Sequence, residues 1–336
     1  MIPVVSALRV QPLVDLATDK PAFLSANTLG LFATSNVDIQ SVNNDFILLK
    51  DTLNPDIHKY IKITYTDRTQ WIGGDGYGYS NSTGSSDIEL AYDFGISSDT
   101  AWIYEKSSDT LTLNAIGQLT SNTIPSTYIQ SKNIIIDDKV TNIGDYAFKG
   151  CTGLTSVTIP NSVTRIGEYA FINCTGLTSV TIPNSVTRIG EYGFINCTGL
   201  TAVHITDLAA WCKIRFSIGD ANPLYRAHNL YLNGEKVTDL VFPEGVTNIE
   251  KRAFYKCTGL TSITIGEGVT SIELQAFEGC SGLTKITCMS ITPPTIGDTT
   301  FPSKSIPVYV PVESVETYKA AQYWSDFTNI QSINEQ

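Results

Sequence analysis

The sequence predicts a mainly β protein: a solenoid with a 23-residue period and a capping C-terminal helix, preceded by a β-rich N-terminal domain. Two observations predict the solenoid. Residues 151–173 and 174–196 are identical except at Ala170 against Gly193, and degenerate copies lie on both sides of this pair. Self-similarity at a fixed period of about 20 to 50 residues is typical of repeat architectures. A separate N-terminal domain is predicted because residues 1–125 lack the repeat.

Within one unit, the apolar pattern separates the interior of the coil from its surface. Leu154, Val157 and Ile159 follow the L-x-x-L-x-L spacing of leucine-rich repeats, so we expect them to point inward from a short strand. Pro160 ends that strand, because proline cannot donate to a continuing ladder. Gly167 is expected to permit a turn. The other inward positions are Val163, Ile166, Ala170, Phe171 and Cys174. The unit therefore predicts columns of like side chains, stacked at the strand spacing of about 4.8 Å.

The period also explains most of the seven cysteines. Those that recur 23 residues apart are Cys151, Cys174 and Cys197, and then Cys257 and Cys280. We interpret them as a buried small-residue position, since a free cysteine behaves as a small hydrophobe. Cys212 and Cys288 lie outside the two series and are open to either interpretation, buried or reactive. No C-x-x-C pair exists and the three histidines have no ligand spacing, so no metal or cofactor is predicted.

The period breaks once, between Phe194 and Phe254, which are 60 residues apart instead of 46. The 14 extra residues fall within 206–236. Asp207 is placed to cap a short helix that carries Trp211.

We expect a hairpin at Asn233-Gly234, because this dipeptide favours a tight turn between strands. The insert then has two interpretations. In the first it is a bulge that rejoins the ladder at Val237, Leu240 and Phe242. In the second it is a protruding binding loop formed by Trp211, Phe216, Tyr225 and His228.

Taken together, these units resemble the BspA-like leucine-rich-repeat family, whose repeat reads x-V-T-x-I-G-x-x-A-F-x-x-C-x-x-L-T-x-V-x-I-P. The resemblance covers about 134–336 and includes the insert. The matching positions of one unit are Ile166, Gly167, Ala170, Phe171, Cys174, Leu177, Val180, Ile182 and Pro183. The resemblance also implies a terminal unit at about 289–336. There a helix at about 313–323, after Pro311, would cover the last coil. The side chains expected to do so are Val315, Tyr318 and Trp324.

What the resemblance implies about function is surface exposure and adhesion. The family is associated with exposed bacterial proteins that adhere and bind, similar domains occur in phage proteins, and there are no catalytic residues to carry over. We therefore expect no enzyme activity.

The N-terminal third resembles no known family. Alternating segments at 60–65, 100–104 and 109–113 are typical of half-buried strands, and the Gly/Ser/Tyr-rich segment 73–87 is expected to be a loop. The first 50 residues suit an extended arm laid along another subunit. A polar segment with Pro125 marks the boundary. The predicted parts are a docking domain at 1–125, a linker at 126–133 and the solenoid at 134–336, with its insert at 206–236.

Composition excludes two classes of partner. The net charge is −11 and the 22 lysines and arginines form no cluster, so nucleic acid is not expected to bind. No apolar run reaches the length of about 20 residues that spans a bilayer, so no membrane insertion is expected. The first 16 residues lack a basic start, so no secretory signal is predicted.

The candidate binding residues are the outward, mostly hydroxyl-bearing positions of the strands. They are Thr155, Ser156, Thr158, Thr178, Ser179, Thr181, Thr201, Ala202, His204, Thr261, Ser262, Thr264, Thr284, Lys285 and Thr287. Hydroxyl rows on a rigid face can hydrogen-bond a protein or a glycan on a cell surface. The alternative is that threonine is there only as a good β-former on a wet face.

Two settings follow from these features. In the first, the protein is a phage virion component, docked on neighbouring structural subunits through residues 1–125, with the solenoid projecting. In the second, it is a secreted or cell-surface bacterial adhesin.

Overall fold

The computed structural model describes residues 46–50, 58–64, 89–90, 92–97, 100–105, 108–115, 117–121, 124 and 128–333. The chain divides into two compact units, Met1–Val140 and Thr141–Gln336, each considered by itself. The predicted loop at 73–87 lies outside the described residues, as does the predicted arm except for its last five residues. The domain bounds expected from the sequence stay a prediction.

The first unit is built of short strands. Its first sheet is antiparallel and holds β1 (Phe46–Lys50), β2 (His58–Thr64) and β3 (Glu89–Leu90). A second group contains β4 (Tyr92–Ser97), β5 (Thr100–Glu105), β6 (Thr110–Asn114) and β8 (Asn133–Ile136). Here β4 to β6 run antiparallel and β8 lies parallel to β6. The strand β7 (Gly117–Leu119) follows β6 in the chain. The three strands predicted from alternation are confirmed as β2, β5 and β6.

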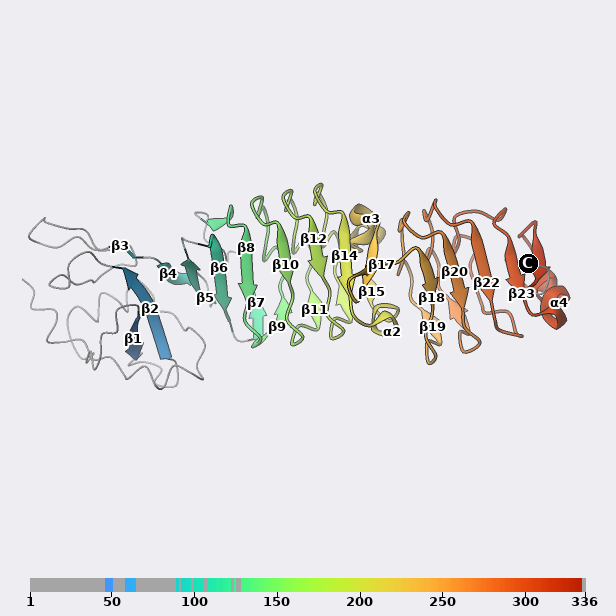
Figure 1. The fold of residues 1–336 in the computed structure, drawn as a ribbon, viewed down its shortest axis with the longest axis horizontal. Helices are drawn as coiled ribbons and strands as arrows, with labels where there is room; N and C mark the ends of the chain where they lie inside the picture. The colour runs from blue at the N-terminus through green and yellow to red at the C-terminus, as the bar shows by residue number, and fades with distance from the viewer. Residues whose placement is uncertain are drawn as a thin grey trace, which may run out of the picture. The chain divides into compact units, whose positions relative to one another are not determined.

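The second unit is a solenoid in which each regular coil contributes one strand to each of two parallel sheets (Figure 1). The strands of the first sheet in this unit are β10 (Ser156–Thr158), β12 (Ser179–Thr181), β14 (Ala202–Ile205) and β16 (Leu230–Leu232). Those of the opposite sheet are β9 (Val140–Ile143), β11 (Arg165–Ile166), β13 (Arg188–Ile189) and β15 (Arg215–Phe216). The register advances by the sequence period, since Val157 pairs with Val180 and Ile166 with Ile189.

Columns of like side chains form the core, as the repeat predicts. Leu154, Val157 and Ile159 are buried, and the intervening Ser156 and Thr158 are exposed. The rings of Phe148, Phe171 and Phe194 stack with centroids 4.8 and 4.9 Å apart. This spacing matches the distance between adjacent strands. Burial of the same side chain in every coil therefore sets the register of the whole stack.

The periodic cysteines are buried, as expected, and the thiols of Cys174, Cys197 and Cys280 also donate hydrogen bonds. The thiol of Cys174 donates to the backbone oxygen of Phe148 over 3.0 Å, and that of Cys197 to Phe171 over 3.1 Å. Each bond reaches back one coil. Cysteine thus fills a small apolar position and satisfies a carbonyl of its neighbour.

The role predicted for Gly167 was wrong. This glycine does not have a positive φ; the left-handed residues of its coil are Tyr169 at 53° and Asn173 at 61°. A Cβ on Gly167 would instead collide with Asp145 of the preceding coil. Glycine is required here because the coils approach closely, while Tyr169 and Asn173 make the turn.

The insert forms α2 (Leu208–Trp211), β15, a 3₁₀ turn η3 (Gly219–Ala221), α3 (Leu224–Ala227), β16 and β17 (Glu235–Lys236). Two expectations are confirmed. The carboxylate of Asp207 caps α2 by accepting the amide N–H of Ala210 over 3.0 Å. Asn233 and Gly234, both at positive φ, turn β16 back onto β17.

Continuity of the ladder through the insert was not correctly predicted. Leu240 and Phe242 return to the core, but β18 (Asp239–Val241) starts a new sheet and does not pair with the first one. The reason is the β16–β17 hairpin. Because β17 runs antiparallel along β16, it occupies the edge that the next coil would have used.

Beyond the insert the solenoid resumes and is then capped. A new sheet begins here, which we call the second sheet of the solenoid. Its strands are β18, β20 (Ser262–Ile265), β22 (Lys285–Cys288), β23 (Val308–Val310) and β24 (Ile330–Ser332). Opposite it lie β19 (Asn248–Ile249) and β21 (Ser271–Ile272).

The predicted cap is present, with a shorter helix than expected. After Pro311 come the 3₁₀ turn η4 (Val312–Ser314) and α4 (Val315–Ala320). Tyr318 and Trp324 are buried and Val315 is half-buried, with Trp324 in the turn that follows the helix.

Candidate functional site

The outward side chains of the first sheet stand in straight columns. In one column, Thr158 pairs with Thr181, Thr181 with His204, and His204 with Tyr231 of the insert. A second column, two residues earlier in each strand, contains Ser156, Ser179 and Ala202. We call the hydroxyl face the outward side chains of Ser156, Thr158, Ser179, Thr181, His204 and Tyr231.

A third outward column has a structural role. The hydroxyl of Thr178 donates to the backbone oxygen of Thr155 over 2.9 Å, and that of Thr201 to Thr178 over 3.2 Å. The same bond recurs beyond the insert, from Thr261 to Thr238 and from Thr284 to Thr261, over 3.1 Å each. These hydroxyl protons hold successive coils together. Threonine is there for more than its β-propensity, and its donor is used within the protein.

The column of Thr158 differs, because no described residue hydrogen-bonds to the hydroxyls of Thr158 and Thr181. It ends on an aromatic pair: the rings of His204 and Tyr231 lie 4.8 Å apart and are inclined by 30°. Hydroxyls can donate and accept, and aromatic rings add apolar contact area. The column therefore offers polar and apolar contacts in one line, which suits a polar ligand with exposed C–H surface.

Tyr231 was not predicted as a site residue, because the insert shifts it out of the period. The signal available in the sequence was alternation. Leu230-Tyr231-Leu232 alternates like Val203-His204-Ile205, and the structure pairs the two segments residue by residue.

The outward face of the second sheet is charged and lies beyond the break. Asp239 accepts hydrogen bonds from the hydroxyls of Ser262 over 2.5 Å and Thr238 over 3.1 Å, which hold the pKa of this carboxyl below its ordinary value. The amine of Lys285 lies 5.0 Å from the ring centroid of Tyr309, a cation–π contact. The candidate residues Thr264 and Thr287 share one column between Val241 and Tyr309.

The insert does not form the aromatic loop of its second interpretation. Trp211 and Phe216 are buried, and their rings pack against each other with centroids 5.4 Å apart. Tyr225 and His228 do reach the surface, where both meet Lys256. The Lys256 amine lies 4.4 Å from the Tyr225 ring centroid, and His228 Nδ1 lies 3.1 Å from the Lys256 backbone oxygen.

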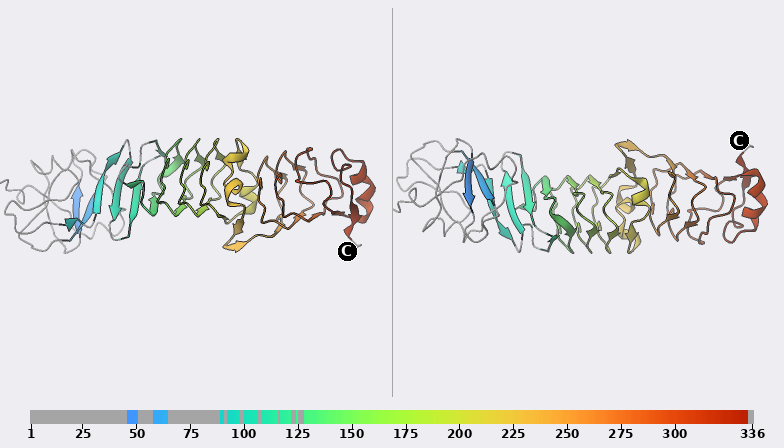
Figure 2. Two further views of the ribbon diagram at one scale, coloured as in Figure 1. Left: turned by 90° about the horizontal axis from the view of Figure 1, so that it is seen from above. Right: turned by 90° about the horizontal axis from the view of Figure 1, so that it is seen from below.

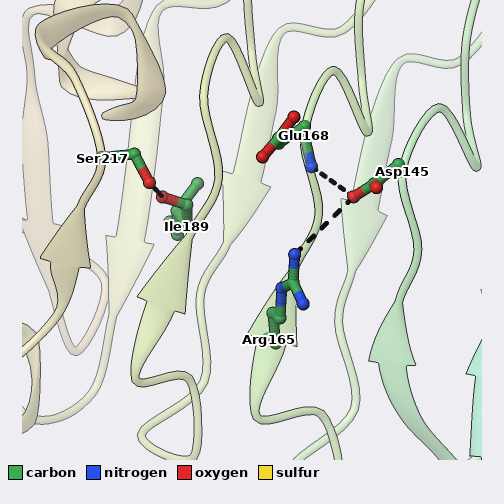
Figure 3. Close-up of polar contacts among 5 residues, drawn as sticks. All are labelled: Asp145, Arg165, Glu168, Ile189 and Ser217. Carbon is green, nitrogen blue, oxygen red and sulfur yellow. Dashed lines mark hydrogen bonds and ion pairs between the residues drawn. The ribbon is translucent and has the colours of Figure 1, made fainter.

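Charges on the opposite sheet are dispersed. Asp145 accepts the backbone N–H of Glu168 over 2.7 Å and pairs with Arg165 at 3.9 Å (Figure 3). Because both side chains of that ion pair are about half exposed, it contributes little to stability. The insert extends the opposite sheet through β15, and the hydroxyl of Ser217, just after β15, donates to the backbone oxygen of Ile189 (Figure 3).

The two cysteines left open by the sequence are buried. Burial raises the pKa of the Cys212 thiol. Burial also raises the pKa of Cys288, against the opposing effect of the hydrogen bond from Tyr318. Thiols held neutral are poor nucleophiles, so the structure favours the buried interpretation over the reactive one.

The described part of the chain holds neither a cluster of metal ligands nor a helix that could span a membrane. No three histidine, cysteine, aspartate or glutamate side chains gather there as a metal site would require. No helix among the described residues is long and apolar enough to span a membrane.

The comparisons agree with the repeat. The family model for the BspA type leucine rich repeat region matches residues 120–211 and 227–335, in six copies. No curated protein matches the chain.

Solved structures of leucine-rich repeat proteins are also similar to the chain. The T. pallidum protein TpLRR is 22% identical over 58% of this chain and 78% of its own, with a TM-score of 0.32. A Bacteroides ovatus protein is 17% identical, over 68% and 80% of the two chains, with a TM-score of 0.28. A cell surface protein of Faecalibacterium prausnitzii is 18% identical, over 71% and 94%, with a TM-score of 0.23.

Proposed function

This chain belongs to the BspA-type leucine-rich repeat family, and from that premise we propose that it is a non-catalytic recognition protein that binds a protein or glycan on a cell surface through the hydroxyl face. The observation that carries the proposal is the column of Thr158, Thr181, His204 and Tyr231. No described residue hydrogen-bonds to the hydroxyls of Thr158 and Thr181. In the neighbouring column, by contrast, the hydroxyl of Thr178 donates to the preceding coil.

Rigidity supports the same role. Each strand of the face is held by a parallel neighbour in the same register, and its inward residues are buried. A preformed face loses little conformational entropy when it binds. Recognition is the function that such a face serves best.

The test replaces Thr158 and Thr181 with glutamate and His204 with alanine, and measures attachment of purified protein to bacterial and epithelial cells. We expect attachment to be lost while the melting temperature stays close to that of the wild type, because these positions point outward. Arg188→Glu, on the opposite sheet, is the control and should attach normally. Unchanged attachment by the triple variant would refute the hydroxyl face as the site.

The setting proposed for this module is a phage particle, with a bacterial surface as the alternative. The family match begins only at residue 120, which supports a separate role for the preceding segment, here docking onto neighbouring subunits. Mass spectrometry of purified particles separates the two settings. Presence of the chain in virions at a fixed copy number is expected, and its absence there would leave the adhesin.

A further inference from the structure

The strand that restarts the ladder after the insert has an open edge. One edge of β18 pairs with β20, with Asp239 opposite Ser262 and Val241 opposite Thr264. No strand of the described residues pairs with its other edge. In Figure 1 the two sheets are separate at this place, and in both views of Figure 2 the β16–β17 hairpin projects from the solenoid.

The groups at this edge can be assigned from the ladder. Thr238 accepts from the N–H of Ser262, and Phe242 donates to Thr264, so these two residues turn their backbone groups toward β20. Because backbone groups alternate along a strand, Asp239 and Val241 turn theirs to the open edge. No described residue bonds to these two N–H and two C=O groups.

A cavity of about 320 Å³ lies beside the open edge. Its walls come from α2, the β16–β17 hairpin and the whole of β18, and its apolar lining includes Leu208, Leu232, Val237 and Leu240. Asp239 and Val241 also line it, and both are exposed, Val241 by 62%. The lining also includes Glu235 and Lys236 of the hairpin, so the cavity has two carboxylates and one amine, and Asp239 is the charge that lies on β18 itself. The site thus offers main-chain groups, an apolar hollow and a carboxylate on the open strand.

We propose that this edge of β18 binds an extended segment of a partner protein as an additional parallel strand, independently of the hydroxyl face. Addition of a strand to an exposed edge is a general mode of peptide recognition. A residue opposite Leu240 would donate to the Asp239 oxygen, accept from the Val241 N–H, and place an aliphatic side chain in the cavity. A basic residue opposite Asp239 meets its charge, and an apolar one covers Val241. The recognised pattern is basic, aliphatic, aliphatic.

The probe is a fluorescent peptide, acetyl-Thr-Thr-Lys-Leu-Val-Thr-Thr-amide, titrated with the full chain and followed by fluorescence polarisation. We expect saturable binding. The control is the same peptide N-methylated on its leucine, which removes the donor to Asp239 and leaves every side chain in place. Binding of the methylated peptide should weaken at least about tenfold, the loss expected from one main-chain hydrogen bond. Equal binding of the two peptides, or no saturation, would overturn the proposal.

Val241→Pro makes the reciprocal test on the protein. Proline is tolerated on edge strands where the N–H faces outward, so this variant should fold and melt like the wild type, yet bind the peptide about tenfold less tightly. Val241→Thr keeps the N–H and should retain main-chain binding. Unchanged affinity of a folded Val241→Pro would contradict the strand-addition geometry.

A second copy of this chain is the competing occupant. Sedimentation of the wild type and of Val241→Pro over a range of concentrations distinguishes it. A wild type that is monomeric at all concentrations is expected. A dimer that the proline variant disperses would assign the edge to self-association and overturn the partner peptide.

Discussion

At the scale of single residues, close approach of the coils decides where glycine is needed. A Cβ on Gly190 would lie 2.7 Å from the backbone nitrogen of Glu168, a distance no real packing allows. A Cβ on Gly268 would meet only the Val246 oxygen, at an ordinary 3.7 Å. Neither glycine has a positive φ. The two positions therefore differ in available space alone.

Gly190→Ala should lower the free energy of unfolding by about 1 to 3 kcal/mol, because the coils must separate to admit the methyl group. The matched variant Gly268→Ala should be neutral or stabilising by up to about 1 kcal/mol, since it only restricts the unfolded chain. Urea denaturation monitored by circular dichroism measures both. Equal effects at the two positions would show that backbone freedom, and not coil spacing, requires these glycines.

The buried thiols couple stability to alkaline pH. Burial raises the pKa of Cys257 to about 12, against an ordinary value of 9.0 in the unfolded chain. The folded state then keeps a proton that the unfolded state releases. The stabilisation is fully present below pH 9 and is lost as the pH rises toward 12.

Cys257→Ala should flatten this dependence. The variant is less stable at pH 7 because it leaves a small cavity, but its free energy of unfolding should fall less steeply between pH 9 and 12. The difference in slope is about 1.4 kcal/mol per pH unit for one thiol. Urea titrations at stepped pH measure it, and parallel slopes for variant and wild type would contradict the raised pKa of Cys257.

At the scale of elements, side chains of the insert replace missing backbone bonds. In regular coils the carbonyl before the core phenylalanine accepts an N–H from the preceding coil, as Ala170 does from Phe148. After the insert, the equivalent oxygen of Ala253 accepts from the Trp211 indole N–H and the Asn222 amide, over 2.9 Å each. Two side chains thus bridge the break in the core.

These two donors should act as a coupled pair. Trp211→Phe should cost about 1 kcal/mol beyond the lost ring contacts, because Asn222 still satisfies the oxygen. Trp211→Phe combined with Asn222→Ala leaves a buried carbonyl unpaired and should cost more than the sum of the two single variants. A double-mutant cycle in urea tests this expectation, and strict additivity would speak against the shared acceptor.

The insert is the part of the solenoid whose packing the sequence predicted least. The period located the core columns, and residue chemistry located the Asp207 cap and the Asn233-Gly234 turn, because each depends on local sequence alone. Neither revealed that β17 blocks the edge of β16 or that Trp211 turns inward. Both depend on which neighbour a strand or ring meets, and once the period is broken no repeat copy shows that neighbour.

The hydroxyl face was predictable in part for the same reason. Outward positions such as Thr158 follow from alternation. The different roles of Thr158 and Thr178 do not follow from it, since both are outward threonines. Only the position of the preceding coil shows that the Thr178 hydroxyl donates to a backbone oxygen there.

At the scale of the solenoid, stability passes from coil to coil, and the terminal unit closes it. Trp324 packs against Tyr318, Phe301 and Phe327 with centroids 5.1 to 5.7 Å away, and its indole N–H donates to the Pro294 oxygen over 2.8 Å. In repeat proteins each coil contacts mainly its neighbours, so loss of a cap opens the structure from that end. The interruption at β17 also divides the ladder into two hydrogen-bonded stretches.

Trp324→Ala should therefore destabilise the two stretches unequally. We expect hydrogen exchange to quicken in β22, β23 and β24, where opening becomes easier by about 3 to 5 kcal/mol, and to change little in β10 and β12. Val312→Ala, at a position in the cap that is 60% exposed, is the matched control and should leave the pattern unaltered. Mass spectrometry of peptides after timed exchange resolves the strands. Equal acceleration in β10 and β24 would mean that the solenoid unfolds as one cooperative unit, in which the broken ladder does not limit how far the damage spreads.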